Sequence, residues 1–259
     1  MPFAEAGSLR IHYRRAGHGE PVVFLHAQGF NRRLWRPQFD ALAGDFDLIA
    51  WDMRGYGDSS DPVEPYTMRD LAGDVAAVLD HAGVESAHVC GISMGGVVAQ
   101  EFAGRYPTRV RRLILADTNP GHGNLPEAER GRRLTLREAD AADPPATARR
   151  RCPEFFSPDV DPEVLAEAIA IMSEFHPRGY ALGARALAES DERALLAGID
   201  APTLVIWGEQ DVICSRAESE YLAAHVPNAR LKVLPCGHMS NMEAPAAFNA
   251  ALLEFLSAE

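Results

Sequence analysis

The stretch Gly91-Ile92-Ser93-Met94-Gly95-Gly96 decides the fold of this chain. It directly follows an apolar run at residues 88–90, which is typical of a buried strand, and directly precedes a helical pattern. A G-x-S-x-G sequence between a strand and a helix predicts a turn so tight that the positions flanking the serine must lack bulk. Such a turn presents the Ser93 hydroxyl at the carboxyl edge of a sheet and at a helix N-terminus, where a developing anion is favoured. We therefore predict that Ser93 is a nucleophile.

Short apolar runs alternate with helical patterns on both sides of this turn. The runs that indicate strands are residues 9–13, 22–25, 48–51, 88–90, 113–115, 203–207 and 231–234. This alternation predicts an α/β fold with a mostly parallel central sheet flanked by helices. Between about residues 120 and 196 only helical or irregular patterns occur, with proline clusters. We therefore expect a core domain of residues 1–119 and 197–259, and a helical cap, or lid, of residues 120–196 over the strand ends.

A serine nucleophile needs a base to accept its proton, and the base needs a carboxylate to orient it. His238 follows the last predicted strand, and Asp211 follows the strand before it. Both residues should lie at the carboxyl edge of the sheet, where open α/β folds place their sites. We predict a catalytic triad of Ser93, His238 and Asp211. The alternative acids are Asp117, which also ends a strand, and Glu209.

An oxyanion hole requires two backbone N–H groups that point at one position. The residue after the nucleophile, Met94, is expected to supply one of them. The loop after the strand at residues 22–25 is expected to supply the other, and we assign it to Gln28. The preceding residues of that loop, His26 and Ala27, are candidates for substrate contact.

The chain has 259 residues, with 25 Lys and Arg against 37 Asp and Glu, for a formal net charge of −12. This charge argues against a nucleic-acid partner, because phosphate binding requires an excess of positive charge. Residues 121–151 differ from the rest, with seven arginines against five acids. Three of these arginines, Arg149, Arg150 and Arg151, are candidates to contact an anionic substrate, although a solvated helical face would explain them equally well.

The chain resembles the α/β-hydrolase family over nearly its whole length. The motifs that carry the resemblance are His26-Ala27-Gln28-Gly29, Asp52-Met53-Arg54-Gly55-Tyr56-Gly57-Asp58-Ser59, Gly91-Ile92-Ser93-Met94-Gly95-Gly96, Gly208-Glu209-Gln210-Asp211 and Gly237-His238. The second motif is interpreted as a structural turn in which Arg54 pairs with Asp52 or Asp58. Within the family, residues 87–96 and 237–249 are most similar to 3-oxoadipate enol-lactonases.

This resemblance implies a serine hydrolase that cleaves a small lactone or ester through an acyl-enzyme, with no metal and no organic cofactor. Alternative functions on the same fold are a general carboxylesterase, an acyl-homoserine lactonase, a cofactor-free haloperoxidase or perhydrolase, and a non-catalytic ligand receptor. The expected partners are a small-molecule ester or lactone and water, with no nucleic acid and no membrane, and a homo-oligomer is left open.

The first residues lack the features of a signal peptide, and no apolar run approaches the roughly 18 residues needed to span a bilayer. The four cysteines are dispersed, which favours buried, reduced thiols. We therefore expect a cytoplasmic protein.

Overall fold

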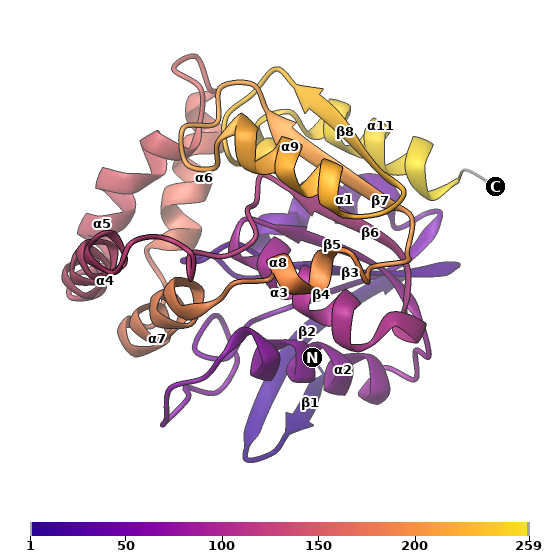
Figure 1. Cartoon of the computed structure of the whole chain (residues 1–259), viewed down its shortest axis with the longest axis horizontal. Coiled ribbons are helices and arrows are strands. Elements are labelled where there is room, and N and C mark those ends of the chain that lie inside the picture. The colour runs from indigo at the N-terminus through magenta and orange to yellow at the C-terminus, as the bar shows by residue number, and fades with distance from the viewer. Residues whose placement is uncertain (1, 258–259) are drawn as a thin grey trace.

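A single eight-stranded sheet forms the centre of the computed structural model, which describes residues 2–257 (Figure 1). The strands are β1 (Phe3–Ala6), β2 (Leu9–Gly17), β3 (Glu20–Leu25), β4 (Phe46–Trp51), β5 (Ala87–Ile92), β6 (Val110–Ala116), β7 (Thr203–Gly208) and β8 (Ala229–Leu234). Their order across the sheet is β1-β2-β4-β3-β5-β6-β7-β8. The β1–β2 and β2–β4 pairings are antiparallel. All the other pairings, along the order β4-β3-β5-β6-β7-β8, are parallel. The prediction of a mostly parallel sheet is confirmed.

The apolar runs in the sequence correspond to the strands at the centre of this sheet. Every residue of β4, β5 and β7 is buried. Strands covered by helices on both faces need apolar side chains on both, which explains why these runs do not alternate with polar residues. The last strand, β8, lies at the sheet edge and carries exposed residues.

Helices pack against both faces of the sheet (Figure 1). The helices of the first and last parts of the chain are α1 (Arg36–Leu42), α2 (Met68–His81), α3 (Met94–Arg105), α9 (Arg216–His225), α10 (Ser240–Glu243) and α11 (Pro245–Leu256), with short 3-10 helices at Arg32–Trp35 (η1) and Pro107–Arg109 (η2). Helix α2 begins with a capping box, in which the side chains of Thr67 and Asp70 each accept from the other residue's backbone N–H. None of the helices within residues 2–257 combines the length and the apolar character needed to cross a membrane.

Residues 120–196, here called the cap segment, contain helices and no strand. They form α4 (Glu127–Ala141), α5 (Pro144–Arg151), the 3-10 helix η3 (Cys152–Phe155), α6 (Pro162–Met172), α7 (Pro177–Glu189) and α8 (Arg193–Leu196). Helices α4, α5, α6 and α7 lie together at one side of the sheet (Figure 1). The structure of this segment is helical, as its sequence pattern predicts.

One sequence-based pairing is corrected by the structure. Arg54 does not pair with Asp52 or Asp58, because its guanidinium makes two hydrogen bonds of 2.7 Å to Asp74 on α2. The carboxylates of Asp52 and Asp58 instead bind the guanidinium of Arg32. The local spacing suggested a partner within the turn, whereas the partner on α2 is reached only through tertiary packing.

Candidate active site

Ser93 lies at the junction between β5 and α3 in a backbone conformation that is rare for a residue with a side chain. Its φ is 54° and its ψ is −124°. A Cβ atom on Gly91 would lie 2.2 Å from the carbonyl oxygen of Gly95, and one on Gly95 would lie 2.1 Å from that of Leu25. Both approaches are far inside van der Waals contact. The structure thus explains why glycine flanks the serine on either side. The positive φ of Ser93 is a backbone strain of the kind that clusters at active sites.

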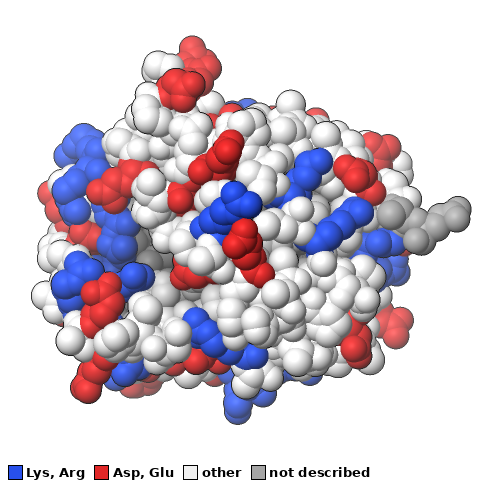
Figure 2. Space-filling view, turned by 45° about the horizontal axis from the view of Figure 1, so that its top comes forward, with Lys and Arg blue, Asp and Glu red and all other residues white. Residues whose placement is uncertain are grey.

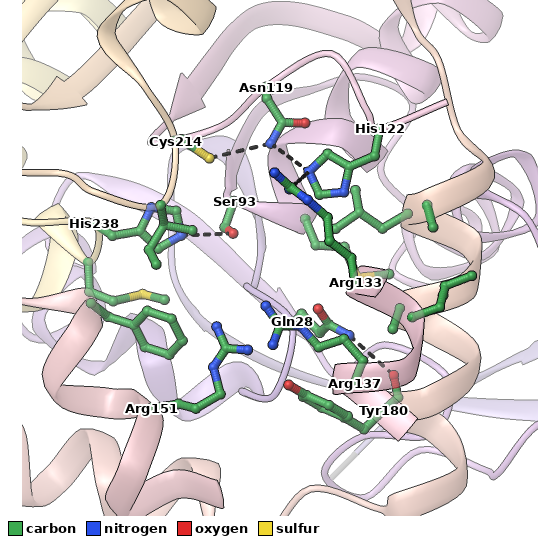
Figure 3. A pocket seen from close by; sticks show the side chains of 18 residues that line it. Gln28, Ser93, Asn119, His122, Arg133, Arg137, Arg151, Tyr180, Cys214 and His238 are labelled. Carbon is green, nitrogen blue, oxygen red and sulfur yellow. Dashed lines mark hydrogen bonds between the residues drawn. The ribbon is translucent and has the colours of Figure 1, made fainter. Parts of the chain in front are cut away.

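The three residues predicted as a triad come together at the carboxyl edge of the sheet. The Ser93 Oγ lies 2.9 Å from His238 Nε2 (Figure 3), and His238 Nδ1 lies 2.8 Å from Asp211 Oδ2. Since a carboxylate only accepts hydrogen bonds, Nδ1 carries the proton and Nε2 is free to accept one from Ser93. The other Asp211 oxygen accepts from the N–H groups of Ile213 at 2.7 Å and Cys214 at 3.0 Å. These bonds fix the orientation of the carboxylate that orients the imidazole.

The alternative acids are held elsewhere. Asp117 Oδ1 accepts from the N–H of Gly208 at 2.8 Å, and its Oδ2 accepts from the hydroxyl of Ser240 at 2.5 Å. Burial raises the pKa of Asp117 to about 7, while nearby His238 lowers it and nearby Asp211 raises it. The side chain of Glu209 is exposed to solvent. Of the three candidate acids, only Asp211 contacts the imidazole.

The two amides assigned to the oxyanion hole are available as donors. Met94 is the first residue of α3, and the first-turn N–H groups of a helix have no acceptor within it. Within residues 2–257, neither the Met94 nor the Gln28 backbone N–H donates a hydrogen bond. The side-chain Nε2 of Gln28 donates to the Tyr180 carbonyl on α7 at 3.2 Å, which connects this loop to the cap segment.

His26 and Ala27 are buried and do not line the cavity beside Ser93. His26 Nδ1 donates to the Ala27 carbonyl at 2.9 Å, and its Nε2 accepts from the Met53 N–H at 2.9 Å. Burial lowers the pKa of His26 to about 4, so the ring is neutral at pH 7 and can both donate and accept. Its role in the structure is therefore to join the loop after β3 to the loop after β4, and not to contact substrate.

A cavity of about 90 Å³, here called the inner cavity, lies between Ser93 and the cap segment. Its polar lining residues are Gln28, Ser93, Asn119, His122, Arg133, Arg137, Arg151, Tyr180, Cys214 and His238 (Figure 3). The apolar part of the lining consists of Met94, Leu134, Phe155, Ala184, Leu187, Ala188, Ile213 and Met239. The combination of apolar walls with a few convergent polar groups is typical of a small-molecule site.

Only one of the three arginines predicted to contact an anionic substrate lines the inner cavity. Arg151 lines it, whereas Arg150 lines a neighbouring outer hollow and Arg149 is exposed and lines neither. Arg133 and Arg137 on α4 also line the inner cavity, although they were not predicted as substrate contacts from the sequence. Their spacing of four residues places them on one helix face, which is the signal that could have identified them.

The guanidinium groups of Arg137, Arg150 and Arg151 converge on the buried carboxylate of Asp140. Their distances to it are 2.9, 2.5 and 3.2 Å respectively. The Arg151 side chain is 7% exposed, and its Nε is buried with no hydrogen-bond partner within residues 2–257. Glu154 adds a second carboxylate, 3.9 Å from Arg151. Two carboxylates against three guanidinium groups leave positive charge beside the inner cavity.

His122 is a further lining residue that the sequence did not single out. Its Nε2 accepts from Asn119 Nδ2 and from Arg133 Nη1, both at 3.4 Å (Figure 3). Burial, together with the nearby charges of Arg133 and Arg193, lowers the pKa of His122 to about 4. The ring is therefore a neutral wall of the cavity, and it orients Arg133.

Two clusters within the described residues bring potential metal ligands within 4.8 Å of one another: Asp211 with Cys214 and His238, and His12 with Asp52 and Asp58. The carboxylate and imidazole of the first cluster are hydrogen-bonded to each other. The carboxylates of the second bind Arg32. Neither cluster presents a set of free donor atoms to a metal ion.

The class of protein follows from this arrangement: a strained serine between a strand and a helix, with an Asp–His pair beyond later strands of a mostly parallel sheet. The family model for the alpha/beta hydrolase fold matches residues 20–155 and 169–245, so the chain belongs to the α/β-hydrolase family.

Among individual proteins, the chain is similar to 3-oxoadipate enol-lactonase 2 of Acinetobacter baylyi. The two are 34% identical over 252 residues, which cover 95% of this chain and 93% of the relative. The solved enol-lactonase from Burkholderia xenovorans is 30% identical with a TM-score of 0.92, and the match covers 99% of this chain and 100% of that one. A hydrolase from Pseudomonas aeruginosa is 35% identical with a TM-score of 0.91, and the match covers 99% and 98%.

Proposed function

We propose that this enzyme, an ester or lactone hydrolase, works through Ser93, His238 and Asp211 and prefers a small substrate that carries a carboxylate. The observation that supports the catalytic mechanism is the continuous chain of hydrogen bonds from Ser93 Oγ through His238 to Asp211. The similarity to 3-oxoadipate enol-lactonases supports the choice of a lactone as the substrate class.

In the first step the Ser93 oxygen attacks the carbonyl carbon while its proton passes to His238 Nε2. The negative charge that develops on the carbonyl oxygen is stabilised by the Met94 and Gln28 amides. Collapse of this intermediate breaks the ester C–O bond, and the leaving oxygen takes the proton from Nε2. In a lactone the leaving oxygen stays attached to the acyl group, so the ring opens on the enzyme.

In the second step water replaces the leaving group. His238 Nε2 removes a proton from the water as its oxygen attacks the acyl-enzyme, and that proton then goes to the Ser93 oxygen as the C–O bond breaks. Asp211 keeps the imidazole in the required tautomer and stabilises its charged form in both steps. Overall, one ester bond and one water molecule are consumed, and one carboxylic acid and one hydroxyl group are formed.

The preference for a carboxylate rests on Arg151. The Arg151 side chain lines the inner cavity, is 7% exposed and shares the Asp140 carboxylate with two other arginines, so its charge is only partly compensated. A substrate carboxylate in the cavity would pair with this guanidinium and offset the surplus positive charge around Asp140. The inner cavity of about 90 Å³ has room for a small reacting group beside Ser93.

Two measurements test the proposal. First, Ser93→Ala should abolish hydrolysis of 4-nitrophenyl acetate while the exposed-serine control Ser8→Ala retains it; turnover by the Ser93 variant at the wild-type rate would refute the assigned nucleophile. Second, 3-oxoadipate enol-lactone should be hydrolysed with a higher kcat/KM than a neutral lactone of matched size. Equal values would instead indicate a general carboxylesterase, and the lack of multiple turnovers on any ester would indicate a ligand receptor.

A further inference from the structure

A second hollow lies beside the inner cavity, at the surface of the molecule. This outer cleft has a volume of about 510 Å³ and lies between α4, the end of α5 and the loop that follows Asp211. It shares Arg133, Arg137, Arg151 and Ile213 with the lining of the inner cavity. The two spaces are therefore neighbours on either side of these four side chains.

The outer cleft is basic, although the chain as a whole is acidic. Its lining includes five arginines: Arg132, Arg133, Arg137, Arg150 and Arg151. Their carboxylate partners are Asp140 and Glu154, which line the cleft, and Glu129, which binds Arg132 and Arg133. Five guanidinium groups against three carboxylates leave a local positive excess in a chain of net charge −12. Figure 2 shows blue side chains gathered on the side of the molecule where α4 and α5 lie.

The cleft also has an apolar rim. Within residues 2–257, six large apolar side chains are exposed, and three of them line this cleft: Leu136 at 49%, Val212 at 78% and Ile213 at 36%. Exposed apolar side chains grouped at the mouth of a site are characteristic of a ligand-binding surface. Arginines beside an apolar rim match a molecule with an apolar body and an anionic end.

We propose that the outer cleft is a second substrate subsite, which binds the anionic end of an ester whose apolar body extends outward from the reacting carbonyl. The inference rests on the proposed hydrolase function and widens the substrate class from small lactones to amphipathic carboxylate esters. The inner cavity holds the reacting group, the apolar rim contacts the body, and Arg132 and Arg150 at the solvent side bind the charge.

The test uses two sets of paired esters on the full chain. One set contains 4-nitrophenyl half-esters of succinate, adipate and suberate with their methyl-capped neutral counterparts, which place the charge on the acyl chain. The other set contains 4-acetoxybenzoate and its methyl ester, which place the charge on the leaving group. For at least one set the wild type should prefer the anionic member, and in the acyl series the preference should grow with chain length.

Arg150→Gln and Arg132→Gln should each reduce that preference about fivefold, as expected for one solvent-side charge contact. Arg149→Gln is the matched control, because it removes the same charge from the same helix end at a residue that lines neither space. If Arg149→Gln lowered the preference as much as Arg150→Gln, long-range attraction of anions would account for it and the subsite would be refuted.

A second pair of variants replaces no arginine. Leu136 is half-exposed on α4 at the rim. Leu136→Lys and Leu136→Glu both lose the apolar rim contact and should weaken neutral esters to a similar extent. Leu136→Lys should raise the ratio of kcat/KM for anionic over neutral esters, and Leu136→Glu should lower it. Equal effects on charged and neutral esters would overturn the proposal. Hydrolysis of 4-nitrophenyl acetate by the wild type distinguishes the two proposals. If the wild type does not hydrolyse this ester, the proposed hydrolase function is contradicted. If it does hydrolyse it but shows no preference for anionic esters, only the subsite is contradicted.

Discussion

Glu243 accepts a hydrogen bond from the N–H of Gly237 at 2.8 Å, directly before His238 in the chain. The same carboxylate accepts from the N–H of Ser157 at 3.1 Å and from the Ser157 hydroxyl, and Ser157 follows η3 of the cap segment. One side chain thus fastens the cap segment to the loop that carries the imidazole. A second link, from the Met239 N–H to the Phe155 carbonyl at 3.1 Å, lies beside it.

Because Glu243 holds the backbone next to His238, it is a positioning residue in the proposed mechanism. We expect Glu243→Ala to lower kcat about tenfold or more on charged and neutral esters alike, with little change in KM, since small displacements of a catalytic group are costly. Glu243→Gln keeps one acceptor oxygen and should restore part of the rate. A control is Glu254→Ala on the exposed side of α11. A rise in KM for anionic esters only would assign Glu243 to substrate binding instead.

Arg151 should determine the preference for small anionic substrates. We expect Arg151→Gln to raise KM for a carboxylate-bearing lactone by about tenfold to a hundredfold, the range for a lost hydrogen bond to a charged group. KM for a neutral lactone should change by less than twofold. Steady-state kinetics with both substrates measure the split, and Arg149→Gln, which should affect neither, controls for net charge. If Arg151→Gln raised KM for both lactones equally, the role assigned to this guanidinium would be refuted.

Asp117 should make the free energy of unfolding depend on pH. Its pKa of about 7 in the folded protein lies above the ordinary 3.8, so the folded state binds this proton more tightly than the unfolded chain does. This contribution to stability is full below about pH 4 and is lost as the pH rises toward 7, with a total on the order of 4 kcal/mol.

Asp117→Asn removes that titration. Urea unfolding at pH 4.5 and pH 8 should therefore show that the variant gains stability relative to wild type as the pH rises. Other carboxylates titrate in both proteins, and the comparison between the two cancels their effect. Parallel pH profiles for wild type and variant would show that Asp117 is ionised throughout.

The glycines provide a matched pair of substitutions. A Cβ atom on Gly95 would meet the Leu25 carbonyl at 2.1 Å, whereas one on Gly73 in α2 would meet nothing within 4 Å. We expect Gly95→Ala to abolish hydrolysis and to lower the melting temperature, because the turn cannot close against the loop after β3. Gly73→Ala should leave activity unchanged and stabilise the protein by about 0.5–1 kcal/mol. Thermal denaturation with 4-nitrophenyl acetate assays measures both, and an active Gly95→Ala variant would contradict the packing argument.

The amino-acid sequence by itself determined the fold class and the three triad candidates. The turn around Ser93 is a local pattern, and local patterns are readable because they depend on neighbouring residues only. Asp211 and His238 are distant in sequence, but each follows a strand, and parallel strands end at the same edge of a sheet. No knowledge of side-chain packing was needed to expect these residues together.

Tertiary structure alone decided which side chains line the inner cavity. Arg149 and Arg151 are two residues apart, yet one is exposed and the other lines the inner cavity, because the packing of α5 determines which face points inward. His26 lies two residues before Gln28, a proposed oxyanion-hole donor, but its ring accepts a hydrogen bond from the Met53 amide of a neighbouring loop. The orientation of a helix and the contacts between loops depend on the whole packed structure, so this information is absent from any short stretch of the chain.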